Sequence, residues 1–146
     1  MSAPLATIDP LQHLSLPAKL RLAAEILGAY ARVRWTLSRR QLPDAVEALR
    51  AHGRSSADPL VTPMPMANRY RLADAVTRLL SVLPTDSRCL MRSLVLLVLL
   101  ERRCIEARFI IGVKTDPAFA AHAWIEHENL ALLPSGAGEY APLTVL

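Results

Sequence analysis

A cysteine and a histidine are the residues of this sequence whose types and spacing best suit chemistry. Cys89 begins an apolar segment typical of a helix, and His122 lies in an alternating run, 121–126, typical of a strand. They are 122 − 89 = 33 residues apart, enough for a helix, a turn and a returning strand. A thiol at a helix N-terminus with a histidine in reach is the arrangement of a nucleophilic cysteine. We therefore expect Cys89 to be a nucleophile and His122 its general base.

The place of Cys89 in its helix distinguishes it from the second cysteine, Cys104. The first helical turn carries unpaired amide groups and the positive end of the helix dipole, which favour a thiolate, and Arg88 and Arg92 flank Cys89. Cys104 lies 104 − 89 = 15 residues on, roughly 22 Å along a helix, so a disulfide is excluded and Cys104 is expected to be structural. The alternative for Cys89 is a small buried core residue, a common role of free cysteines.

A Cys–His pair usually needs a third group that orients the imidazole through its second nitrogen. Strand alternation places His122, Trp124 and Glu126 on one face, and Glu126 is the first candidate although it lies two pairs along the strand. Asp116, in a turn before the strand, is the alternative. A backbone carbonyl or an amide side chain is a further option.

The elements that must position these residues come in the order helices, then strands. Helical spacing of apolar residues predicts three helices, from 15 to about 40, from 43 to about 51 and from about 68 to 83. The second helix is expected to end near Gly53, and residues 52–66 are expected to be a proline-rich linker or loop. The helix that carries Cys89 is expected to follow a cap at Thr85 or Asp86 and to run to about Arg103. It is apolar nearly all round from Leu94 to Leu100, which indicates a buried central helix.

Beyond this helix the periodicity changes to that of strands. We expect a strand over 105–113 closed by Gly112, a second over 122–126, and one or two more over 130–133 and 140–145. These strands should form an antiparallel sheet packed on the Cys89 helix, an α+β fold. We divide the chain into an N-terminal helical segment and linker, 1–66, and a core, 67–146, that together form one compact unit.

Composition excludes several classes of protein. The 146 residues are 52% hydrophobic, which is enough for a hydrophobic core, so disorder is not expected. The net charge of +4 comes from dispersed arginines and only 5% of the residues are aromatic, so nucleic-acid binding is not expected either. The N-terminus lacks the features of a signal peptide, and the longest apolar run is too short to span a membrane. No spacing of cysteine and histidine is typical of a metal site, and no cofactor is expected. Two free thiols fit a cytoplasmic protein.

Four short stretches occur in an order that is typical of one known family. They are Cys-Leu-Met-Arg-Ser-Leu at 89–94, Glu-Arg-Arg-Cys-Ile-Glu-Ala at 101–107, Ile-Gly-Val-Lys-Thr-Asp-Pro at 111–117 and Ala-His-Ala-Trp-Ile-Glu at 121–126. Together they resemble the transglutaminase-like leader peptidases of lasso-peptide biosynthesis, the B proteins, over about residues 85–146. The resemblance implies a transglutaminase/papain-like core in which a central helix carrying Cys89 packs on a small sheet carrying His122.

The resemblance also implies an activity and partners. Such a cytoplasmic cysteine peptidase removes the leader of a ribosomally made precursor peptide, after which a macrolactam cyclase acts on the freed amine. Because residues 1–84 show no strand-rich recognition domain, the chain resembles the stand-alone form that needs a separate leader-binding recognition element. The family's nucleophile and base correspond to Cys89 and His122. Its third member, typically an acid about twelve positions after the histidine, corresponds to Pro134, which is a departure.

Two alternative functions share the same scaffold. In the first, an amine attacks the acyl-enzyme, which makes the protein an acyltransferase. In the second, the chain is a catalytically weak transglutaminase-like scaffold that only binds a peptide, and the absence of an acid at Pro134 favours it.

Overall fold

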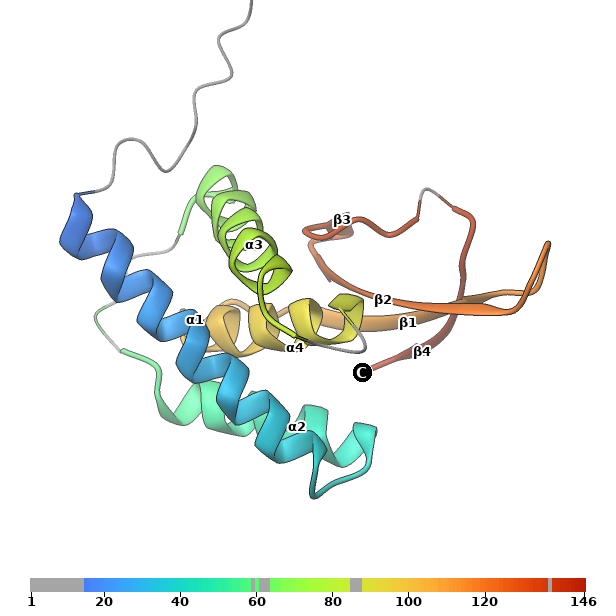
Figure 1. Ribbon diagram of the computed structural model, residues 1–146, viewed down its shortest axis with the longest axis horizontal. Helices are drawn as coiled ribbons and strands as arrows, with labels where there is room; N and C mark the ends of the chain where they lie inside the picture. The colour runs from blue at the N-terminus through green and yellow to red at the C-terminus, as the bar shows by residue number, and fades with distance from the viewer. Residues whose placement is uncertain (1–14, 59, 61–63, 85–87, 137) are drawn as a thin grey trace, which may run out of the picture.

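The computed structural model describes residues 15–58, 60, 64–84, 88–136 and 138–146, and places four helices before four strands. The elements are α1 (Leu16–Leu37), α2 (Leu42–Ser55), α3 (Met66–Ser81), α4 (Arg88–Glu101), β1 (Arg108–Lys114), β2 (Ala120–His127), β3 (Leu130–Ala131) and β4 (Ala141–Val145). Figure 1 shows the other helices gathered around α4, with the sheet extending away from them. The predicted α+β class is confirmed. The proposed capping residues, Thr85 and Asp86, lie outside the described residues.

Helix α4 is the buried centre of the fold because its sequence is apolar on every side. All side chains from Leu94 to Leu100 are 0% exposed, and α4 contacts the three other helices as well as β1 and β2. The helix ends at Glu101, two residues before the predicted Arg103. It stops there because Cys104 adopts a left-handed conformation (φ 56°) and the Ile105 amide donates back to a carbonyl of the last turn, a helix C-cap.

Helix α2 is longer than its sequence suggests. Gly53 was expected near its end, before a loop over 52–66, but the helix continues to Ser55. The glycine serves packing instead, because a Cβ on Gly53 would lie 2.6 Å from the Cβ of Glu101 on α4. Residues 52–55 of that expected linker are therefore helical, and the glycine lets two helices approach closely.

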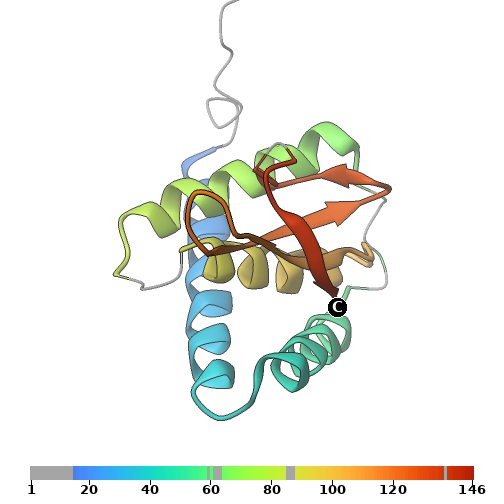
Figure 2. The same cartoon turned by 90° about the vertical axis from the view of Figure 1, so that its right-hand side faces the viewer.

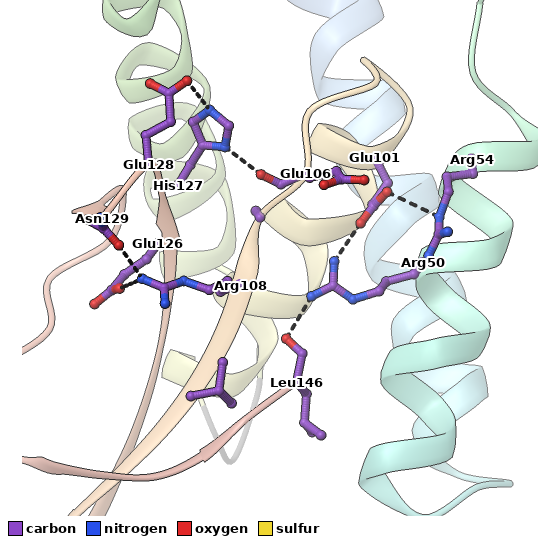
Figure 3. A pocket seen from close by; sticks show the side chains of 12 residues that line it. Arg50, Arg54, Glu101, Glu106, Arg108, Glu126, His127, Glu128, Asn129 and Leu146 are labelled. Atoms are coloured by element: carbon purple, nitrogen blue, oxygen red, sulfur yellow. Dashed lines mark hydrogen bonds and ion pairs between the residues drawn. The ribbon is translucent and has the colours of Figure 1, made fainter.

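Buried charge holds α2 against α4 and the end of β4. Glu101 is almost fully buried, and Arg50 donates to it at 2.6 Å while also donating to the Leu146 carbonyl at 2.7 Å. Arg54 adds a longer ion pair with Glu101, at 3.4 Å. Figure 3 shows these side chains in a charged pocket at the C-terminal end of α4, where every arginine drawn has an acidic or carbonyl partner.

The sheet is antiparallel in the order β3-β2-β1-β4. The sequence led us to expect Gly112 at the end of β1, but Gly112 lies inside the strand. It pairs with His122 of β2 on one side and with Pro142 of β4 on the other. A bulge between Ile111 and Gly112 shifts the register with β4. In Figures 1 and 2 the β1–β2 hairpin lies toward the end of the molecule at which α4 begins.

Candidate active site

Cys89 is the second residue of α4 and is half-buried. Both cysteines are free thiols, and Cys104, beyond the other end of the helix, is exposed. Arg92 and Ser93 lie one turn after Cys89, on the same side of the helix. The Arg92 Nε and the Ser93 Oγ are buried without a hydrogen-bond partner among the described residues. The helix turn after the thiol therefore contains two buried polar atoms whose hydrogen bonds are not satisfied within the described part of the chain.

His122 lies on β2, the strand that α4 contacts most, near the hairpin end of the sheet. Because the chain reverses after α4, the start of that helix and the hairpin end of the sheet come to the same end of the molecule (Figure 2). The fold thus brings Cys89 and His122 to one end. In the part of the chain that is described, no hydrogen bond joins the thiol to the imidazole.

One nitrogen of His122 has a short hydrogen bond to the main chain. Its Nε2 lies 2.6 Å from the carbonyl oxygen of Pro134. Because a carbonyl only accepts, Nε2 carries the proton, and Nδ1 is the acceptor in the neutral ring. Nδ1 has no hydrogen bond among the described residues and is not a buried atom, so it is open to a thiol, a substrate or water.

Two aromatic rings hold the imidazole from its sides. The Trp124 ring stacks on it with centroids 5.9 Å apart and an interplanar angle of 23°, and the Tyr140 ring lies 5.2 Å away at 37°. Both separations fall in the range of attractive ring contacts. With Nε2 fixed by Pro134, the orientation of the imidazole is determined by three residues from β2 and from the segment before β4.

Two glycines make this arrangement possible. A Cβ on Gly112 would lie 2.7 Å from the Trp124 ring and 2.9 Å from the Cβ of Tyr140. A Cβ on Gly136, which has φ +78°, would lie 2.5 Å from the Tyr140 ring. Both positions therefore require a residue without a side chain, because the rings around His122 occupy that space.

Lys114 extends the cluster on the side of Tyr140. Its ammonium lies 5.0 Å from the Tyr140 ring centroid and 3.2 Å from Glu139 Oε2. The pKa of Lys114 is raised, first by its hydrogen bond with Glu139 and then by the charge of that carboxylate. Lys114 therefore stays protonated and fixes the ring that packs on His122.

The comparison with known families decides what kind of scaffold carries this site. Residues 20–146 match the family model of the transglutaminase-like superfamily. The chain belongs to this superfamily. The match includes α4 with Cys89 and the whole sheet with His122, and the superfamily includes cysteine proteases as well as transglutaminases. A search of curated proteins and a search of solved structures each give no match.

The two acids proposed to orient His122 have other surroundings. Glu126 shares the face of Trp124, as alternation predicted, but accepts from the Trp124 indole at 2.9 Å and pairs with Arg108 at 2.8 Å. Asp116 is exposed in the β1–β2 turn. Neither carboxylate hydrogen-bonds the His122 ring in the described ranges. The partner found there is the carbonyl of Pro134, the position at which the resemblance to the leader peptidases led us to expect an acid.

Sequence reasoning missed three residues of the site. Tyr140, Gly112 and Gly136 were not singled out for a role around His122. A glycine inside a β-branched run is a known sign of close approach by another group, so Gly112 carried a usable signal. Gly136 lies in an irregular segment whose path no periodicity predicts, and Tyr140 lies just before β4, at the first residue of the strand expected over 140–145.

Two further kinds of feature, a metal-ligand cluster and a membrane-spanning helix, were sought in the described residues. In those ranges no three histidine, cysteine, aspartate or glutamate side chains come together as metal ligands would. Nor does any helix there combine the length and apolar character that crossing a membrane requires.

Proposed function

We propose that this chain is a cysteine peptidase that removes the leader from the precursor of a lasso peptide. Membership of the superfamily supports cysteine chemistry, and the ordered motifs around Cys89 and His122 support the finer assignment. The observation that carries the proposal is the state of His122. Because Nε2 is held by Pro134 and Nδ1 is open, the ring is oriented to accept a proton at one defined atom.

The reaction follows from these positions. Cys89 Sγ gives its proton to Nδ1 of His122 and attacks the carbonyl carbon of the last leader residue. The peptide C–N bond breaks as Nδ1 returns the proton to the leaving amine, and a thioester remains on Sγ. Water then loses a proton to Nδ1 and attacks the thioester, which frees the leader as its carboxylic acid and restores the thiol. The Cys89 amide, in the first turn of α4, is our candidate oxyanion donor.

The proposed partners are peptides and proteins. A separate recognition element holds the leader, and the freed amine passes to the macrolactam cyclase. We place the reaction in the cytoplasm, where Cys89 and Cys104 stay reduced.

The decisive test uses the purified chain, its precursor peptide and the recognition element, followed by intact mass spectrometry. We expect two fragments whose masses sum to that of the precursor plus one water. The Cys89→Ala variant should give none, while Cys104→Ala, which removes the other thiol, should cleave normally. Leader release by Cys89→Ala would end the proposal.

The same assay separates the two alternatives. Amine capture would join two molecules instead of adding water, which the product masses reveal. A binding scaffold would show no product and an ordinary thiol. Iodoacetamide labelling tests this with an internal control: an unactivated, half-buried Cys89 should react more slowly than the exposed Cys104, so faster and pH-independent labelling of Cys89 indicates activation.

A further inference from the structure

Arg92 is a half-buried arginine beside the nucleophile. It lies one turn after Cys89, on the same side of α4. Its Nε is buried without an acceptor, and its two terminal nitrogens are not buried and have no hydrogen bond among the described residues either. A charged donor that is withdrawn from water without an acceptor destabilises the fold. Packing therefore holds the guanidinium in place while its outer edge stays open to another molecule.

The lack of a partner sets Arg92 apart from the other half-buried arginines of the described ranges. Each of the others has an acceptor: Arg50 pairs with Glu101, Arg69 donates to the Met64 carbonyl, and Arg102 and Arg103 pair with Glu25. This fold thus supplies an acceptor wherever an arginine serves its own stability. The absence of an acceptor at Arg92, within the part of the chain that is described, indicates that the acceptor comes from outside the chain.

The start of α4 is more positive than the start of a helix normally is. Arg88 and Arg92 lie four residues apart, hence on one face, and the first turn contains no acidic residue. The helix dipole already places its positive end there, where cations are unfavourable. Neither guanidinium pairs with a carboxylate in the ranges that the structure describes. A bound anion would relieve both the repulsion between the arginines and their conflict with the dipole.

A second polar side chain of this turn also lacks a partner. Ser93 is 0% exposed, and its Oγ has no hydrogen bond to any described residue. A serine inside a helix commonly bonds to the carbonyl four residues earlier, which here belongs to Cys89. Because helical side chains lean toward the N-terminus of their helix, Arg92 and Ser93 both lean toward the turn of Cys89. Two donors without acceptors therefore lie beside the nucleophile.

A carboxylate is the anion that a peptide substrate brings to this place. A guanidinium binds a carboxylate through two parallel N–H donors. Cleavage at Cys89 creates one carboxylate, at the end of the released leader, and acidic side chains of the substrate are a second source. Residues three apart on a helix have Cβ atoms about 5–6 Å apart, and an extended peptide advances about 3.3–3.6 Å per residue. A carboxylate at Arg92 therefore lies within about three residues of the cleaved bond.

We propose that Arg92 binds a carboxylate of the substrate peptide, within about three residues of the bond that is cleaved. This inference rests on the proposed function, because it takes the substrate to be a peptide. Arg92 acts on the substrate directly, and the exposed Arg88, one turn earlier, adds positive charge to the same face. The second turn of α4 thus takes part in substrate selection, in addition to the first turn that carries the thiol.

The test measures binding without chemistry, on the full chain carrying Cys89→Ala. The probes are three N-acetylated tripeptides: trialanine with a free C-terminal carboxylate, alanine–glutamate–alanine with an amidated end, and trialanine with an amidated end. Nitrogen NMR follows the backbone amides of α4 and the Arg92 Nε–H, whose burial slows its exchange with water. We expect saturable shifts with a carboxylate probe and at least about tenfold weaker binding of the uncharged probe. The carboxylate probe that binds more tightly identifies the source of the carboxylate.

Two variants locate the binding and a third serves as the matched control. Arg92→Gln removes the charge and should weaken binding of the carboxylate probes about tenfold or more. Arg92→Lys keeps the charge without the two-donor fork and should bind with intermediate strength. Arg21→Gln removes an exposed arginine in the second turn of α1, which also has no partner among the described residues, and should bind as the parent does. Unchanged thermal unfolding would show that all three variants are folded.

The outcomes separate the carboxylate site from the reaction. Equal binding of charged and uncharged probes, no saturable shift with either carboxylate probe, or parent-like binding by Arg92→Gln would each overturn the inference. Parent-like binding together with a changed pH midpoint for iodoacetamide labelling of Cys89 would assign Arg92 to the thiolate instead. If carboxylate probes bind through Arg92 while the wild-type chain cleaves no precursor, the carboxylate site stands and the proposed peptidase function fails.

Discussion

Replacing Gly112 by alanine is the sharpest test of how His122 is held. The new methyl would lie 2.7 and 2.8 Å from two atoms of the Trp124 ring and 2.9 Å from the Cβ of Tyr140. Carbon atoms in contact normally lie about 3.5–4.0 Å apart, so at least one of these two residues must move by roughly 1 Å. Both rings pack on His122, and the imidazole must follow or lose a contact.

The expected effect on stability is modest and the effect on activity is large. Overpacking costs about 1–3 kcal/mol, and removing a glycine from a strand returns about 0.5–1 kcal/mol, which leaves a net loss of about 0–2.5 kcal/mol. For a chain of this size that lowers the melting temperature by up to roughly 8 °C. A misplacement of about 1 Å at a catalytic group costs roughly 100-fold in rate. Gly112→Ala should therefore remain folded but cleave precursor about 100-fold more slowly.

Three measurements test this reasoning. Thermal unfolding gives the stability, kcat/KM for precursor cleavage gives the activity, and nitrogen NMR of the His122 ring reports whether Nε2 still carries the proton. The control is Gly28→Ala, because nothing lies within 4 Å of a Cβ at Gly28 in α1; it should stabilise the helix by up to about 1 kcal/mol and leave activity intact. A folded Gly112→Ala protein with unchanged kcat/KM and unchanged ring signals would refute the argument.

Three further predictions concern stability. Glu101→Ala leaves Arg50 and Arg54 without their buried acid and should lower the free energy of unfolding, measured in urea, by about 3 kcal/mol. This is at the low end for a broken buried pair because Arg54 stays largely in water, and an unchanged urea midpoint would contradict the prediction. Cys104→Gly relieves a left-handed residue and should raise stability by up to about 1 kcal/mol, seen as a higher melting temperature. Burial, aided by nearby guanidinium groups, lowers the pKa of His52 in the folded chain. Its contribution to stability is therefore complete above the unfolded pKa of about 6.5 and declines as the pH falls below it, so His52→Gln should flatten the melting temperature between about pH 7 and pH 5.

The sequence predicts the elements well where periodicity is strong. The apolar run from Leu94 to Leu100 identified the central helix, and the alternation from His122 to Glu126 identified β2 and its faces, because burial on all sides and burial on one face leave different patterns. Boundaries were predicted less well. Gly53 was taken as a helix end although it permits contact with α4, a fact about a second helix that local sequence does not contain.

The sequence predicts the reactive side chains of the site but not the main-chain group that orients His122. Helix polarity and strand alternation singled out Cys89 and His122, whereas the search for an orienting acid led to Glu126 and Asp116. A main-chain carbonyl is present at every residue, so no residue type could mark Pro134 as the partner of His122. Only the path of the chain between β3 and β4 places that oxygen, and this path depends on packing among residues distant in sequence.

That oxygen also determines how the site can change through mutation. A single amino-acid substitution can remove a carboxylate, but no substitution removes a backbone carbonyl. Position 134 therefore tolerates changes of side chain as long as the local path of the main chain is kept. Proline favours that constancy, because its ring restricts φ. Insertions or deletions between β3 and β4 would displace the oxygen directly. The hydrogen bond between His122 and this carbonyl is therefore robust to substitution at position 134 and vulnerable to changes in loop length.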